Sequence, residues 1–173
     1  MTCKIHNKTN KNMDKLTNMI DQFYPYAKEN LNINLPVVVN LVSDTKNALN
    51  PLGKTAYYAP NSNEITLFVD GRHIKDIMRS FSHELVHHSQ NCYGEFDNSP
   101  TTHEGYAQTD DHLRKMEEDA YKRGNMVFRD WEDSKKTKKE RFNTIKGRML
   151  MERLIKNGVG SKICQLYYML IKL

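Results

Sequence analysis

Apolar positions in the first part of the chain change from a helical to an extended pattern. Between Leu16 and Phe23 they recur every three or four residues, which predicts an amphipathic helix over residues 12–30 that Pro25 disturbs. The run at 35–42 (LPVVVNLV) is short and rich in β-branched residues, which favours a strand. A helix followed by a strand is therefore expected at the start of the chain.

The next segments predict a loop and a hairpin. Residues 44–54 contain an Asn-Pro pair and a glycine, which are typical of a loop. Two β-prone stretches, 55–59 and 64–69, flank the turn sequence Pro-Asn-Ser-Asn. This arrangement predicts an antiparallel hairpin.

Helical spacing returns after residue 71. It predicts a helix of about 18 residues that ends near Asn91, with apolar positions at Ile74, Met78, Phe81 and Leu85. A loop, a long helix, a basic helix and a short apolar stretch follow over residues 93–109, 110–131, 138–156 and 163–173. The order of elements predicts an α+β fold with a short antiparallel hairpin and a helical C-terminal tail.

Charge is distributed unevenly along the chain. The formal net charge is +5, from 26 Lys and Arg against 21 Asp and Glu. Residues 134–156 hold nine basic and two acidic residues, a net charge of +7, which leaves 17 basic and 19 acidic residues, net −2, elsewhere. We therefore expect a main domain over residues 1–133 and a basic helical extension over 134–173 that packs on the same domain.

Cysteine usage and hydropathy exclude several classes of protein. Cys3, Cys92 and Cys164 are odd in number and lack CxxC spacing, which argues against a disulfide scaffold and a cysteine zinc site. No apolar run approaches the roughly 18–20 residues of a transmembrane helix, and the polar residues 1–15 do not resemble a secretory signal. We expect a protein of the reducing cytoplasm.

The sequence His-Glu-Leu-Val-His at 83–87 is the clearest chemical signal. His83 and His87 are one helical turn apart, so both imidazoles can bind the same metal ion. They lie nearly opposite the apolar stripe of the predicted helix, which would allow one side to be buried while the other lines a cleft. His88 points about 100° away from His87, which indicates a packing or surface residue.

A catalytic zinc site needs a third protein ligand. The extended motif that supplies it as a third histidine is absent, because Gln90 and Tyr93 occupy the positions of its glycine and histidine. A metzincin is therefore excluded. The remaining source is a carboxylate on the following helix, where residues 117–119 are three consecutive acids.

Helical geometry distinguishes these acids. With Leu113 set at zero, Glu117 lies at about 40°, inside the apolar stripe of the helix, and the two acids after it lie outside the stripe. A carboxylate on a buried face is costly unless it is paired or bound to metal. Glu117 is therefore the predicted ligand, and the small residues Ala120 and Gly124 would let the two helices approach closely.

These motifs resemble the gluzincin group of zinc metallopeptidases. The likeness rests on HELVHH at 83–88 and on Glu-x-x-Ala at 117–120, covers about residues 55–131, and is nearest to the small, minimal members found in phages and bacteria. Many relatives have an aspartate four residues after the ligand glutamate, where this chain has Tyr121. A hydrogen-bond partner for a ligand histidine is then expected elsewhere.

The resemblance implies a zincin-like domain that hydrolyses peptide bonds through a zinc-activated water. Zinc would be bound by His83, His87 and Glu117, and Glu84 would be the general base that passes the water's proton to the leaving amine. The oxyanion needs a further donor. Candidates in or near the loop between the two helices are His103, Tyr106 and His112.

The substrate is expected to be a protein or peptide. One of the predicted hairpin strands, 55–59 or 64–69, could bind it by strand addition, although an ordinary edge strand is equally expected. Tyr57 and Tyr58 would then border the cleft.

The basic extension leaves the function open in one respect. A solvated helix face is the simplest interpretation, but an acidic partner or nucleic acid would also fit its charge. Three functions remain: a zinc peptidase, a zinc protease tethered to nucleic acid by the extension, or a non-catalytic zinc-binding structural protein. The intact Glu84 argues against the third.

Overall fold

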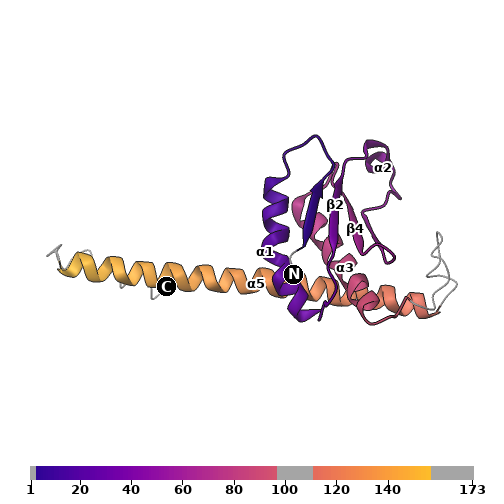
Figure 1. Cartoon of the computed structure of the whole chain (residues 1–173). Helices are drawn as coiled ribbons and strands as arrows, with labels where there is room; N and C mark the ends of the chain where they lie inside the picture. The colour runs from indigo at the N-terminus through magenta and orange to yellow at the C-terminus, as the bar shows by residue number, and fades with distance from the viewer. Residues whose placement is uncertain (1–2, 97–110, 157–173) are drawn as a thin grey trace. The chain divides into compact units, whose positions relative to one another are not determined.

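The computed structural model describes residues 3–96 and 111–156, and its fold is α+β, as predicted (Figure 1). The chain divides into two units, Met1–Trp131 and Glu132–Leu173. The predicted apolar stretch at 163–173 and most of the loop at 93–109 lie outside the described residues.

A four-stranded sheet forms one layer of the first unit. Its order is β1-β2-β4-β3, with bounds Lys4–Asn7 for β1, Val38–Val42 for β2, Glu64–Phe68 for β4 and Ala56–Ala59 for β3. β1, β2 and β4 run parallel, and β3 pairs antiparallel with β4, which confirms the predicted hairpin. β3 is therefore an edge strand. β1 was not expected, because four residues carry little periodic signal.

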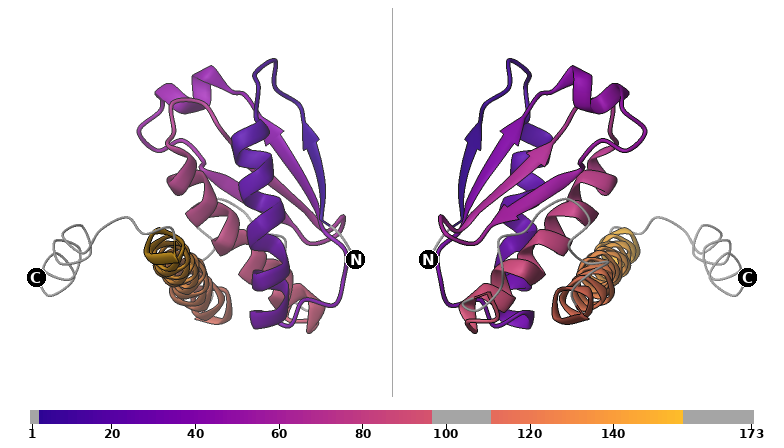
Figure 2. Two further views of the ribbon diagram at one scale, coloured as in Figure 1. Left: turned by 90° about the vertical axis from the view of Figure 1, so that its left-hand side faces the viewer. Right: turned by 90° about the vertical axis from the view of Figure 1, so that its right-hand side faces the viewer.

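Two helices cover one face of this sheet (Figure 2). α1 spans Asp14–Asn30 and α3 spans Ile74–Cys92, each within two residues of its predicted limits. Pro25 lies inside α1 and does not end it. The core between the layers contains fully buried side chains from both helices and the central strands, among them Phe23, Phe81, Leu85, Ile65 and Leu67.

Two expectations about the helices are wrong. Residues 44–54 do not form only a loop, because α2 occupies Thr45–Leu49. The Asp44 side chain caps this helix by accepting a hydrogen bond of 2.9 Å from the Asn47 backbone N–H.

The predicted long helix and the predicted basic helix are a single helix, α5, over Asp111–Lys156. The segment between them has no glycine or proline and contains an ion pair of 2.9 Å between Lys136 and Asp133.

Among the residues that the structure describes, no helix is long and apolar enough to cross a membrane.

Candidate metal centre

The two faces of α3 lie in different environments. Met78, Phe81 and Leu85 are fully buried on the core side. On the other side, the His83 side chain is 25% exposed and the His87 side chain 9% exposed. The helix thus holds the histidine pair at the border between core and cleft, as its periodicity predicts.

α5 comes close to α3 at one point. A Cβ built on Gly124 would lie 2.9 Å from the Cα of His83, too close for any side chain. The hydroxyl of Ser82 donates a hydrogen bond of 2.7 Å to the Gly124 carbonyl at the same crossing. This confirms that small residues on α5 permit a close approach of the helices.

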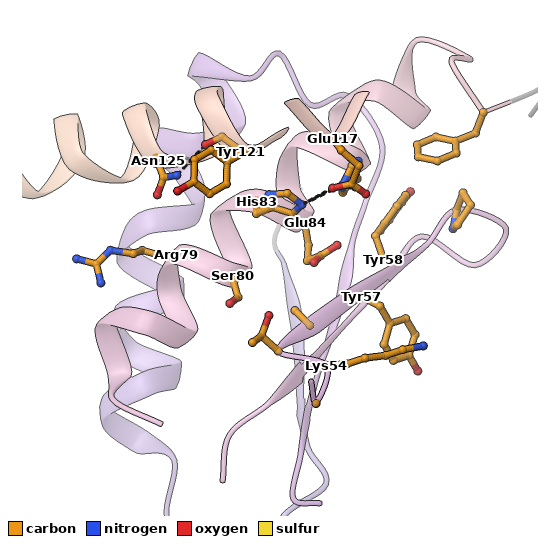
Figure 3. Close-up of a pocket in the computed structure, with 16 residues that line it drawn as sticks. Lys54, Tyr57, Tyr58, Arg79, Ser80, His83, Glu84, Glu117, Tyr121 and Asn125 are labelled. Atoms are coloured by element: carbon orange, nitrogen blue, oxygen red, sulfur yellow. Dashed lines mark hydrogen bonds and ion pairs between the residues drawn. The ribbon is translucent and has the colours of Figure 1, made fainter. Parts of the chain in front are cut away.

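Three donor groups converge next to this crossing (Figure 3). Glu117 Oε2 lies 3.2 Å from His83 Nε2, and Glu117 Oε1 lies 3.5 Å from His87 Nε2. The two imidazole Nε2 atoms are 3.1 Å apart, and one donor atom from each of the three residues falls within 4.8 Å of the others. Two imidazole nitrogens and a carboxylate oxygen in this arrangement can hold a metal ion.

The two acids that follow Glu117 in the sequence lie outside this cluster. Glu118 is exposed. Asp119 Oδ2 accepts hydrogen bonds of 3.1 Å from Gln90 and 3.0 Å from Arg123. The position of Glu117 among the three acids therefore agrees with the helical-phase argument.

Glu84 is buried beside the cluster and is 7% exposed. Burial raises the pKa of its carboxyl group, and the neighbouring His87 and His83 offset part of this rise. The backbone of Tyr58 on β3 also favours the ionised carboxylate and lowers its pKa slightly. Glu84 is thus a base candidate that is not one of the three clustered donors.

His87 carries opposing influences on its protonation. Burial disfavours the charged imidazolium, but the hydrogen bond with Glu117 and the charge of Glu84 outweigh burial and raise the pKa of His87. Its second ring nitrogen, Nδ1, lies 2.8 Å from Gln90 Oε1. This contact was not predicted, although Gln90 follows His87 by three residues, a spacing that places the two side chains on one helix face.

His88 is a packing residue, as expected, and is fully buried. Its Nδ1 lies 2.9 Å from the Tyr58 hydroxyl, and its Nε2 donates to the Leu35 carbonyl at 3.2 Å. Burial lowers its pKa. His88 and Tyr58 therefore join α3 to β3 behind the cluster.

Of the three candidates for an oxyanion donor, only His112 lies among the described residues. His103 and Tyr106 lie outside the described residues. His112 is exposed, and its Nε2 lies 3.1 Å from the Glu95 carbonyl. It does not line the cleft beside the cluster of donor groups.

A cleft of about 820 Å³ opens beside the cluster (Figure 3). Its walls come from β3 and the segment before it, from one side of α3, and from α5, where Tyr121 and Asn125 follow Glu117 by one and two turns. Tyr57 and Tyr58 border it, as the sequence predicts. The histidine pair and both glutamates line the same cleft.

Comparisons with protein-family models, with curated proteins and with solved structures found no match for this chain.

Proposed function

We propose that this chain is a zinc-dependent metallopeptidase. The observation that carries the proposal is the convergence of His83, His87 and Glu117 beside the buried carboxylate of Glu84, in one cleft. Catalytic zinc sites commonly use three such protein ligands and leave a further position for water or substrate. The same residues are those that the gluzincin resemblance implies.

Glu84 is suited to the proton transfers of hydrolysis. A bound zinc ion would lower the pKa of a coordinated water. Glu84 can take a proton from a water held in the cleft and return it to the leaving amine, because its carboxylate lies beside the cluster without belonging to it. Its buried position raises the pKa of its carboxyl group, which strengthens Glu84 as a proton acceptor.

The edge strand β3 offers a backbone for an extended peptide. Thr55 C=O accepts the Phe68 N–H on the β4 side, so in this register the backbone groups of Ala56 and Tyr58 point away from β4. Both residues line the cleft, and so does Glu84. A peptide paired with Ala56 would therefore pass close to the proposed base.

The proposal is tested by metal analysis together with hydrolysis of a mixed peptide library. Wild-type protein supplied with zinc should hold about one zinc per chain, cleave peptides and lose activity in chelator. Glu84→Gln should keep zinc but lose at least about a hundredfold in turnover, since proton transfer by a positioned base contributes that much. Glu29→Gln, which removes an exposed carboxylate from α1, should behave like wild type.

Two results would contradict the proposal. Wild type without bound zinc would exclude the ligand set. If wild type binds zinc but cleaves no peptide, and Glu84→Gln behaves in the same way, the non-catalytic structural protein would be favoured instead.

A second candidate function concerns the basic extension. Residues 134–156 carry a net charge of +7, and the structure places them on α5, where the basic side chains from Lys135 to Arg148 are exposed. Exposed cations concentrated along one helix are the electrostatic footprint of a polyanion-binding segment. We propose that this segment binds nucleic acid and keeps the peptidase near it, in the cytoplasm that the cysteine usage favours.

A further inference from the structure

Gln90 occupies a buried position between the two helices that carry the clustered donors. It is 1% exposed. Its Oε1 lies 2.8 Å from His87 Nδ1, and its Nε2 donates to the Met116 carbonyl and to Asp119 Oδ2, both at 3.1 Å. One amide side chain on α3 thus contacts His87 and also the turn of α5 that contains Glu117.

These partners fix the direction of the amide. The Met116 carbonyl oxygen and Asp119 Oδ2, which also accepts a hydrogen bond from Arg123, are acceptors, so the NH₂ group of Gln90 must face α5. The amide oxygen then faces His87 and can only accept. His87 must therefore carry its hydrogen on Nδ1.

This tautomer has a consequence for the cluster. With hydrogen on Nδ1, the neutral imidazole that binds a metal ion has its lone pair on Nε2, and a hydrogen that Nε2 shares with Glu117 in the metal-free protein would leave when the ion binds. Nε2 is the His87 atom that faces His83 and Glu117, at 3.1 and 3.5 Å. The hydrogen bond from His87 to Gln90 thus aims the free lone pair at the position a metal ion would occupy.

The second half of the amide restrains the other helix. Met116 directly precedes Glu117, and its carbonyl is bound to Gln90. Asp119, two residues after Glu117, is held by Gln90 and by Arg123. The turn of α5 that carries the third donor is therefore tied to the same side chain that orients the second.

We propose that Gln90 is a positioning residue of the metal centre: it selects the His87 tautomer and ties the α5 turn bearing Glu117 to α3. The inference rests on the proposed metal site. It assigns to a neutral amide the support that ligand histidines often receive from a carboxylate. An amide gives this support without adding negative charge beside Glu84 and Glu117.

The test compares two buried hydrogen bonds on the same helix. Gln90→Met keeps the length of the side chain but removes its amide. Ser89→Ala removes an equally buried hydrogen bond of 2.7 Å, from Ser89 to the Leu31 carbonyl, on the side of α3 away from the cluster. Zinc affinity is measured by competition with a chromophoric chelator, and melting of the metal-free proteins measures the general cost.

Gln90→Met should weaken zinc binding about tenfold to a hundredfold, while Ser89→Ala stays within about twofold of wild type even though both variants lose melting temperature. Wild-type zinc affinity in Gln90→Met, or an equal loss in Ser89→Ala, would overturn the inference. If wild type itself binds no zinc, the proposed site and this inference both fail; if wild type binds zinc and only the Gln90 effect is missing, the inference fails alone.

A measurement on the unaltered chain covers the case in which Gln90→Met does not fold. Long-range ¹H–¹⁵N spectra of zinc-loaded wild type should show His87 protonated at Nδ1 and metal-bound through Nε2. Binding through Nδ1, with hydrogen on Nε2, would overturn the inference.

Discussion

Glu117 and Glu118 are neighbours in the sequence but occupy different environments. The Glu117 carboxylate lies within 3.5 Å of both histidines, whereas Glu118 is exposed. The difference arises from the rotation of about 100° per residue along α5, not from the chemistry of the side chain. At the residue scale, the proposed site therefore depends on helical phase.

Exchanging each acid for its amide tests this dependence. Glu117→Gln should release zinc, with an affinity loss of at least about tenfold, because an amide oxygen is a much poorer zinc ligand than a carboxylate. Glu118→Gln should retain wild-type affinity. Metal content after dialysis distinguishes the two variants, and zinc retained equally by both would show that Glu117 is not a ligand.

At the scale of elements, the site depends on how closely α3 and α5 cross. Gly124 makes this crossing possible, since a Cβ there would meet the His83 backbone at 2.9 Å. The Ser82 hydroxyl fixes the same crossing through the Gly124 carbonyl. Glycine is unfavourable inside a helix, and close backbone approach is the reason this one is tolerated.

Gly124→Ala should therefore destabilise the protein despite its better helix propensity. The added methyl group must push the helices apart, at a cost of about 1–3 kcal/mol, and the shift should also weaken zinc binding by moving Glu117 away from His83. Gly147→Ala on the same helix, in the second unit, is the matched control and should leave stability unchanged or raise it by up to about 1 kcal/mol. Chemical denaturation measures both, and a stabilised Gly124→Ala would contradict the crossing argument.

At the scale of the whole molecule, the two units differ in charge. The segment with the proposed chemistry precedes residue 134, and everything outside residues 134–156 has a net charge of −2, against +7 within them. A net charge of +5 for the chain thus describes neither part. The proposed hydrolysis and the proposed binding of polyanions can be tested separately.

Duplex DNA provides the test of the basic segment. Wild type should bind it with an affinity that falls steeply as salt rises, because bound phosphates release counterions. Replacing Lys138, Lys139 and Lys146 by Gln should lower the slope of log affinity against log salt by up to about three, without changing zinc content. A control that removes three exposed lysines elsewhere, at Lys4, Lys8 and Lys46, should leave the slope unchanged.

Equal effects of the two triple variants would show that binding follows total charge rather than this segment. No binding by wild type would remove the second candidate function and leave the peptidase proposal intact.

Features that depend on local periodicity follow from the order of residues alone. The spacing of His83 and His87 and the phase of Glu117 each follow from one helix, so their faces were predictable before any tertiary contact was known. The hairpin and the limits of α1 and α3 were predictable for the same reason. The cap of α2 and the continuity of α5 are also local features. They were not predicted, because the turn-forming residues in 44–54 favoured a loop and the change in charge composition near residue 134 favoured two separate helices.

Contacts between distant segments depend on packing and do not follow from local periodicity. β1 becomes a strand by pairing with β2 more than thirty residues away, and four residues specify such pairing weakly. Gln90 acquires its contacts with Met116 and Asp119 only when α3 and α5 cross at Gly124. A polar side chain in a sequence does not reveal which buried partner will satisfy it, because that partner is set by packing between helices rather than by spacing along one.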